Sequence, residues 1–202
     1  RSSDLTAMTF PVYNLINSMG INDTHAGLIL IYTCSGIAVS FMVIKNYSGD
    51  IMNFEMAAEM AAAEGINVEK VIVDDDVAVE NSTWTIGKRG IAGTIFVHKI
   101  AGAKAEAGGS LSEVQGIAQK VVDNVASMGM ALAPCTVPAA GKPSFELAED
   151  EVEIGMGIHG EPGTHREKIS SADEITAHLM DKIFGNLTLN TGDEVAVLVN
   201  GL

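Results

Sequence analysis

The sequence is poor in the residues that hold small secreted proteins together. It has 2 cysteines in 202 residues, Cys34 and Cys135, and only 5% aromatic residues. A disulfide framework needs more cysteines in a shorter chain, so we expect both thiols to be reduced. Cys135 could be a nucleophile, but free cysteine is usually a small buried hydrophobic residue. The apolar 47% is mainly aliphatic, which favours layered α/β packing over an aromatic-rich sandwich.

Basic residues are also scarce. There are 12 lysines and arginines against 26 acidic residues, and the formal net charge is -14. Such a surface repels phosphate backbones and anionic lipid, so we predict no nucleic-acid binding and no membrane binding. The apolar run 27–44 is interrupted by polar residues and is rich in β-branched ones, so it predicts two buried strands and not a membrane helix. No secretory signal pattern is found, and we expect a cytoplasmic protein.

Nucleotide-binding motifs are missing as well. The stretch "AAGKPS" (139–144) resembles a phosphate loop, but Thr136 stands where the first glycine is required, and Pro143 separates Lys142 from the serine. The stretch "GIHGEPG" (157–163) lacks the glycine order of a dinucleotide site. Four histidines have no metal-ligand spacing and are interpreted as structural or surface residues: His25, His98, His165 and His178.

Apolar strand patterns alternate with helical ones along the chain. We predict helices over 51–65, with Asp50 as N-cap, and over 90–108, and two more after the capping boxes Ser110–Glu113 and Ser171–Glu174. Strands are predicted over 26–33, 37–44, 68–76, the start of 130–138, 144–148, 151–156 and 193–202. This order predicts a single α/β domain over 1–202, a layered sheet with helices packed on its faces.

The first candidate site is "KNYSGD", Lys45 to Asp50, between a predicted strand and a predicted helix. Ligands collect at the carboxyl ends of strands in α/β sheets, and this loop offers an ammonium, an amide, a phenol and a carboxylate there. The alternative is structural: Asp50 caps the helix and Lys45 is a surface charge.

The second candidate is His159, which is surrounded by Gly155, Gly157, Gly160 and Gly163. Glycine is used where a backbone turns sharply or approaches something closely. The imidazole could be a nucleophile, a general base, a metal ligand or a structural hydrogen-bond donor. A loop with special backbone needs and an ionisable group favours function over plain packing.

The third candidate is the acidic run Asp74 to Asp76 at the end of a predicted strand. Carboxylates of this kind can hold Mg²⁺. They also form ordinary turns at strand ends, and we favour that interpretation.

Three stretches together resemble the dihydroxyacetone-binding (K) subunit or domain of dihydroxyacetone kinases. They are "KNYSGD" (45–50), "VIVDDDVAVENSTWTIGKRGIAGT" (71–94) and "CTVPAAGKPSFELAEDEVEIGMGIHGEPG" (135–163). The resemblance covers about 42–202, and 1–41 diverge. The family has an earlier segment ending in Gly-His-Glu-Pro that does not occur here, and we expect this chain to be part of a longer or rearranged protein.

The resemblance implies a role for four residues. His159 would add to the ketone of dihydroxyacetone and hold it as a covalent hemiaminal, which glycerol cannot form. Asp50 would act near the hydroxyl that receives phosphate, Lys45 would hydrogen-bond the substrate, and Gly160 would let the loop close around it. The chain would thus be a component of a dihydroxyacetone (glycerone) kinase.

The resemblance also implies the partners. This chain would bind no metal or cofactor itself; nucleotide and Mg²⁺ would be on a partner kinase subunit or domain, or phosphate would come from a phosphoprotein of a phosphotransferase system. A homodimer is expected. Two alternatives stay open: a regulatory paralogue that binds dihydroxyacetone without transferring phosphate, and a metal-dependent hydrolase that uses Asp74 to Asp76.

Overall fold

The computed structural model describes residues 41–80, 87–134, 136, 141–143 and 145–201. The predicted strand 26–33, both cysteines and His25 lie outside these ranges, as does the first half of the predicted strand 37–44.

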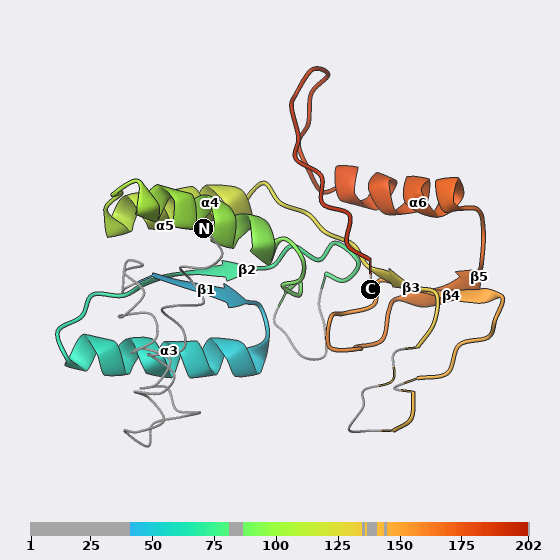
Figure 1. Ribbon diagram of the computed structural model, residues 1–202, viewed down its shortest axis with the longest axis horizontal. Helices are drawn as coiled ribbons and strands as arrows, with labels where there is room; N and C mark the ends of the chain where they lie inside the picture. Colours follow the sequence, from blue (N-terminus) through green and yellow to red (C-terminus); the bar gives the residue numbers. More distant parts are fainter. Residues whose placement is uncertain (1–40, 81–86, 135, 137–140, 144, 202) are drawn as a thin grey trace, which may run out of the picture.

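The first half of the described chain is a three-layer α/β unit. Strand β1 (Phe41–Lys45) pairs in parallel with β2 (Glu69–Val73), and α3 (Ser48–Ala63) connects them. Figure 1 shows α3 on one face of this sheet, with α4 (Thr94–Glu106) and α5 (Leu111–Val122) together on the other. A parallel pair needs such a crossover connection, because a tight turn cannot return the chain to the same end of the sheet.

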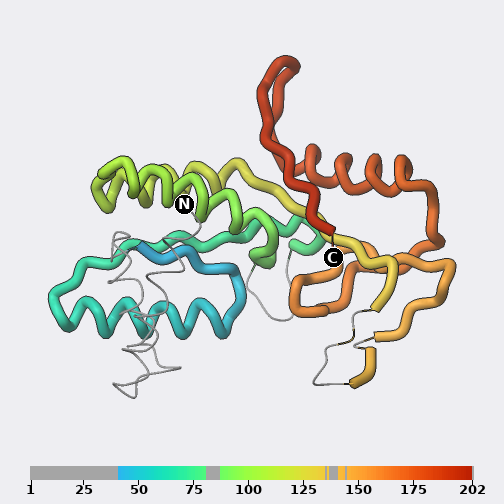
Figure 2. The backbone as a smooth tube through the Cα atoms, viewed as in Figure 1, coloured from blue at the N-terminus to red at the C-terminus, as the bar shows by residue number. Residues whose placement is uncertain are grey.

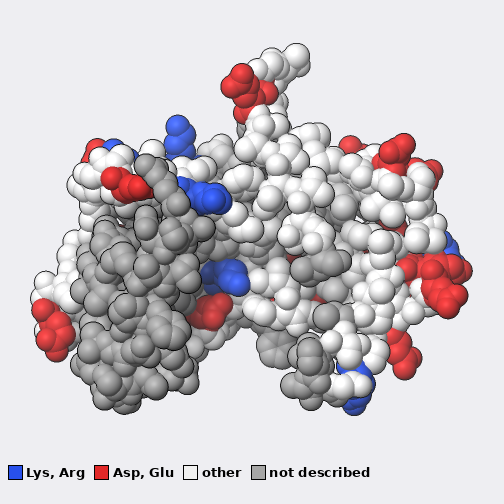
Figure 3. Space-filling model, viewed as in Figure 1, with Lys and Arg blue, Asp and Glu red and all other residues white. Residues whose placement is uncertain are grey.

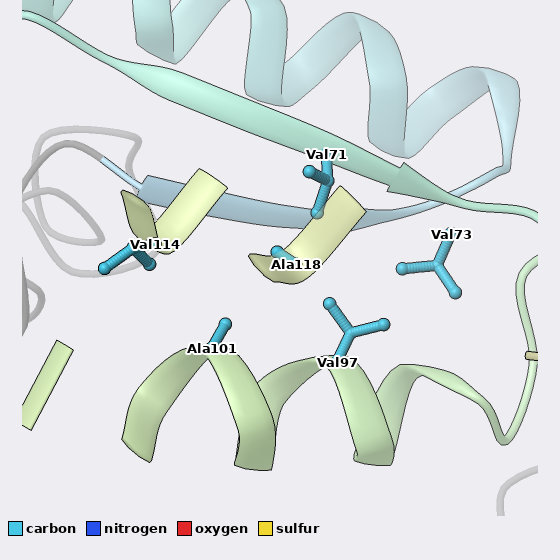
Figure 4. Close-up of a cluster of buried hydrophobic side chains, with 6 residues drawn as sticks. All are labelled: Val71, Val73, Val97, Ala101, Val114 and Ala118. Carbon is cyan, nitrogen blue, oxygen red and sulfur yellow. The ribbon is translucent and has the colours of Figure 1, made fainter. Parts of the chain in front are cut away.

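The main core lies between the sheet and the pair α4 and α5. Its buried residues come from β2, α4 and α5, and each element contributes two. The two are spaced by two residues in the strand and by four in the helices, which places them on one face. They are Val71 and Val73, Val97 and Ala101, and Val114 and Ala118. Figure 4 shows these side chains converging from β2 and the two helices. The small side chains allow close packing of helices on the sheet.

The second half is an antiparallel sheet with one helix. Its strand order is β3 (Met130–Ala131), β4 (Glu151–Ile154) and β5 (His165–Lys168), followed by α6 (Ala172–Phe184). Figure 2 shows this half beside the first, with an extended segment after α6 that leaves the body and returns. Hydrogen bonds between the strand β2 end and the α5–β3 connection join the halves: Val77 donates to Ser127, and Ser127 to Asp75.

The α/β class with helices on the faces of a sheet is confirmed, and the predicted elements differ from the observed ones in four places. Residues 145–148 and 193–201 form no strand, while β5 was not predicted. The helix predicted from residue 51 begins at Ser48, so Asp50 lies in its first turn and is not the N-cap, which is Tyr47. Both predicted capping boxes are formed, and Gly65 follows the end of α3 with φ 78°.

One face of the described surface can be followed in Figure 3. On the face shown in Figure 3, acidic side chains are scattered over both halves, and the described basic side chains stand as separate small spots. In the ranges that the structure describes, no helix is both long enough and apolar enough to cross a membrane.

Candidate functional site

The turn between β1 and α3 is fixed by backbone contacts. Asn46 donates its N–H to the Val73 carbonyl (2.9 Å) at the end of the neighbouring strand, and its side-chain amide donates to the Lys88 carbonyl (2.6 Å). Tyr47 follows in an extended conformation as the N-cap of α3, without a side-chain cap. The carboxyl end of β1 thus presents Tyr47 and the first residues of α3 at one edge of the sheet.

The loop after β4 carries His159 and folds back on itself. Gly157 donates to the Glu161 carbonyl (3.1 Å), Gly160 donates to the Gly157 carbonyl (3.1 Å), and Thr164 donates to Ile154 (2.8 Å), which closes the loop. Glycine is required at two of these positions. A Cβ on Gly157 would collide with the Glu161 carboxylate, and Gly160 has φ 79°, where other residues are strained.

His159 is held by one carboxylate through two contacts. Its backbone N–H donates to Glu161 Oε2 (2.9 Å), and its ring Nδ1 lies 3.2 Å from Glu161 Oε1. The His159 side chain is 55% exposed, whereas that of Glu161 is 12% exposed. An imidazole that donates Nδ1–H to a carboxylate keeps its lone pair on Nε2. Glu161 therefore favours the tautomer with a nucleophilic Nε2.

Tyr47 forms the wall against which the imidazole lies. The two rings meet edge to face, with centroids 4.7 Å apart and planes at 65°. Tyr47 is only 8% exposed, and its hydroxyl is buried without a hydrogen-bond partner among the described residues. This contact brings the loop after β4 to the start of α3, across the junction of the two halves.

The pKa values of the Tyr47 phenol and the Glu161 carboxylate are shifted in opposite directions. Burial raises the pKa of Tyr47 well above its usual value, and the nearby negative charge of Glu161 raises it further. Burial also tends to raise the pKa of Glu161, but hydrogen bonds from backbone N–H groups and from His159 outweigh it, and the net pKa is below the usual value. At neutral pH the site therefore contains a neutral phenol and an ionised carboxylate.

An open hollow of about 350 Å³ adjoins these groups. It is lined by five residues: Tyr47, Ser48, Gly49, His159 and Glu161. Its lining brings the two strongest sequence candidates, the "KNYSGD" turn and the His159 loop, to one place. An exposed imidazole at a concave surface is the arrangement that a covalent substrate site needs.

The other predicted site residues lie near the hollow without lining it. Lys45 ends β1, two residues before Tyr47, and faces His98: burial first, and the Lys45 charge second, lower the pKa of that histidine. Asp50 is the residue after Gly49, in the first turn of α3. Gly160 lies in the loop next to His159.

The acidic run Asp74 to Asp76 is used in structural contacts. Asp75 is buried and accepts hydrogen bonds from the backbone N–H groups of Ile91 (2.8 Å) and Gly93 (2.7 Å), just before α4. Asp76 is buried against Arg89, whose Nη2 lies 2.6 Å from Asp76 Oδ2. Over the described residues, no three His, Cys, Asp or Glu side chains are grouped so that they could hold a metal ion. Asp75 and Asp76 thus make structural contacts, but both are buried and are not the solvated turn residues that an acidic strand end predicts.

Two of the remaining histidines share one carboxylate. His165 Nε2 and His178 Nδ1 lie 3.5 Å and 3.4 Å from the two oxygens of Glu167, between β5 and α6. Neither histidine lines the hollow, although His165 follows Glu161 by only four residues, and both fit the structural interpretation. The lining residue that the sequence analysis did not single out is Glu161, whereas Tyr47 was included only as the phenol of the "KNYSGD" turn. Glu161 had a signal, since an acidic residue two positions after a loop histidine can reach its ring nitrogen.

The comparisons with known proteins agree with this picture. The family model of the Dak1 domain matches residues 28–202, so the match starts earlier than the resemblance over 42–202 predicted. The dihydroxyacetone-binding subunit DhaK of a PTS-dependent dihydroxyacetone kinase 1 from Listeria innocua is 55% identical over 161 residues, covering 80% of this chain and 49% of the relative. The chain thus spans about half the length of this relative.

Solved structures show the same fold. The native dihydroxyacetone kinase of C. freundii superposes with a TM-score of 0.73 at 37% identity, covering 81% of this chain and 30% of that one. A dihydroxyacetone kinase operon co-activator, Dha-DhaQ, superposes with a TM-score of 0.71 at 36% identity, covering 81% of this chain and 50% of that one. Since the family model covers far more than half of the sequence, the chain belongs to the Dak1 domain family.

Proposed function

We propose that this chain is the dihydroxyacetone-binding component of a dihydroxyacetone kinase. In this proposal His159 holds the ketone as a covalent hemiaminal while a partner subunit or domain supplies the phosphate. The observation that carries it is the His159 imidazole, 55% exposed at the hollow, with Nδ1 on Glu161 and a ring edge-to-face contact with Tyr47. The kinase subunits among its relatives support the choice of substrate.

The chemistry needs no other reactant. The Nε2 lone pair attacks the carbonyl carbon, the C=O π pair moves to oxygen, and that oxygen takes a proton from a solvent water, which regains one when the Nδ1 proton leaves the ring by way of Glu161. The ring becomes positively charged as the N–C bond forms, and it regains neutrality by releasing the Nδ1 proton toward Glu161. A carboxylate with a lowered pKa stabilises the positive ring while it exists. Histidine and ketone thus combine without loss of any atom.

Covalent capture also accounts for selectivity. The hollow of about 350 Å³ is much larger than a three-carbon molecule, so its shape alone cannot separate a small ketone from a polyol. A nucleophile makes the distinction through chemistry, because a polyol has no carbonyl to attack.

Three neighbouring residues complete the proposed site. Asp50, one residue beyond the lining residue Gly49, would take or orient the proton of the hydroxyl that accepts phosphate. Lys45 would hydrogen-bond the substrate from the end of β1. Gly160 would let the loop close over the adduct, since its φ of 79° suits glycine.

The rest of the reaction is assigned to partners. Nucleotide and Mg²⁺ would be bound by a partner kinase subunit or domain, or phosphate would come from a phosphoprotein of a phosphotransferase system, as in the PTS-dependent relative. The hollow is open to solvent at the surface, so a partner could reach an adduct there. A homodimer in the cytoplasm is part of the same proposal.

A carbon NMR titration with dihydroxyacetone labelled at the carbonyl carbon tests the adduct. We expect the ketone signal to give way to a tetrahedral carbon signal, and we expect His159→Ala to abolish it while the thermal midpoint stays near the wild-type value. His178→Ala, on α6, is the matched control and should still form the adduct. A ketone signal that persists in wild type, or an adduct in His159→Ala, would refute the proposal.

A second candidate is a regulatory paralogue that binds dihydroxyacetone without transferring phosphate. It is favoured by one observation, the similarity to the operon co-activator. Both candidates predict the adduct, so phosphate transfer in the presence of partner kinase subunits separates them. Adduct formation without transfer would select the regulatory function.

A further inference from the structure

A buried arginine lies directly behind the His159 loop. The Arg89 side chain is 2% exposed and pairs with Asp76, which is fully buried. Arg89 Nε donates to Asp76 Oδ2 (2.7 Å), and the Asp76 backbone N–H donates to the Arg89 carbonyl (3.0 Å). The other carboxylate oxygen, Oδ1, accepts from the Ala78 N–H (3.0 Å). The charge of the arginine is therefore balanced inside the first half of the molecule.

The same guanidinium reaches across to the second half. Arg89 Nη2 donates to the Gly155 carbonyl (2.6 Å), immediately after β4. Gly155 is also held from its other side, because its N–H donates to the Gly129 carbonyl (2.7 Å). A Cβ built on Gly157 would come within 2.9 Å of Arg89 Nη1. The guanidinium therefore lies beside the backbone from 155 to 157, and one of its in-plane N–H groups bonds the Gly155 carbonyl.

Only a planar fork can make this set of contacts. One guanidinium bonds a carboxylate through Nε and Nη2 and a carbonyl through Nη2, with Nη1 against Gly157. A lysine ammonium could keep the charge pair with Asp76, but it is a single nitrogen on a flexible stem and cannot reproduce the fork. The contact with the loop thus depends on the shape of arginine and not on its charge alone.

We propose that Arg89 is a positioning residue. It fixes the first residues of the His159 loop, Gly155 to Gly157, and thereby places the imidazole against Tyr47. Its part in substrate capture rests on the function proposed above. Arg89 does not line the hollow, so it acts through the backbone of Gly155 and Gly157. If residues 155–157 were displaced by a fraction of an ångström, the nucleophile would move away from the bound ketone.

The test compares Arg89→Lys with Arg166→Lys. Arg166 is the matched control, because its Nε also pairs with a buried carboxylate, Glu153 (2.7 Å), while its side chain is 47% exposed and, in the part of the chain that the structure describes, it has no hydrogen bond to residues 155–160. The first readout is the proton NMR shift of the His159 ring, which the edge-to-face contact with Tyr47 displaces from that of a free imidazole. It is measured without substrate. The second is the Kd for labelled dihydroxyacetone from the adduct signal.

In Arg89→Lys we expect the His159 ring shifts to move toward free-imidazole values and the Kd to rise at least tenfold, with less than a twofold change in Arg166→Lys. If Arg89→Lys does not fold, the double variant Arg89→Met with Asp76→Leu removes both charges together, a replacement that cores often tolerate, and should show the same displacement. Unchanged His159 ring shifts in the folded variant would overturn the proposal. Wild-type protein that forms no adduct would refute the proposed function instead, and the ring shifts would still decide the role of Arg89.

Discussion

At the scale of single residues, the site depends on how one carboxylate is shared. Glu161 accepts from the backbone N–H of His159 and faces its ring Nδ1, so it fixes both the position and the tautomer of the imidazole. Tyr47 adds a buried ring that packs edge to face on the imidazole. The His159 side chain is exposed, whereas Glu161 and Tyr47 are mostly buried.

This arrangement makes a prediction about acid. The pKa of Glu161 is lowered from the usual 4.5. A carboxylate whose pKa is depressed by folding contributes its full stabilisation above the usual value and loses it as the pH falls through the lowered one. We therefore expect the NMR shift of the His159 backbone amide to titrate below pH 4.5, in a transition that Glu161→Gln removes.

The control for this titration is His178, whose contact is with Glu167 on another element. Its backbone amide should show the same pH response in wild type and in Glu161→Gln. A His159 amide that titrates identically in both proteins would show that Glu161 does not hold it.

At the scale of elements, two helices share one N-terminal motif and differ in what they bury. In α5, Ser110 and Glu113 form a reciprocal capping box, and Val114 and Ala118 enter the core. In α6, Ser171 and Glu174 form the same box, but no residue of the helix is buried. The same local chemistry therefore supports a core helix in one case and a surface helix in the other.

We expect Ser110→Ala to lower the free energy of unfolding by about 1 kcal/mol, the usual cost of losing a serine N-cap. Ser171→Ala removes an equivalent cap, but α6 can fray without opening the core, so the global free energy should change much less. Urea denaturation followed by circular dichroism measures both. Equal losses in the two variants would mean that α6 unfolds together with the core.

Most elements could be predicted from the sequence because their signals are local. The capping boxes, the alanine-rich pattern of α3 and the apolar runs of β1 and β2 are properties of neighbouring residues. Strand β5, with the sequence HREK, has no apolar alternation and exists because it pairs with β4. Residues 193–201 have a strand-like sequence but no paired strand in the described ranges, since alternation does not supply a partner.

At the scale of the whole molecule, the site is made where the two halves meet. The glycines around His159 indicated a functional loop, and the position after β1 indicated a strand-end site. That these two features meet could not be read from spacing, because Tyr47 and His159 are far apart in the chain and come together through the fold. Arg89 left no sequence signal for the same reason: its two partners, Asp76 and Gly155, lie in different halves.

The joined halves predict two levels of stability, which hydrogen exchange can separate. The amides of β1, β2, α4 and α5 surround the main core, so we expect them to exchange only through global unfolding. Asp75 and Val77 are bonded to Ser127, and Arg89 is bonded to Gly155, so β4 should be protected to nearly the same level. Helix α6, which buries no residue, should exchange through local opening at a much lower free energy.

In Arg89→Lys the protection of the β4 amides should fall toward that of α6, while the β2 amides keep their protection. The reason is that the hydrogen bond from the Arg89 guanidinium to the Gly155 carbonyl is lost. Protection of β4 that stays equal to that of β2 in the variant would show that the backbone bonds of Asp75 and Val77 to Ser127 suffice to hold the halves together.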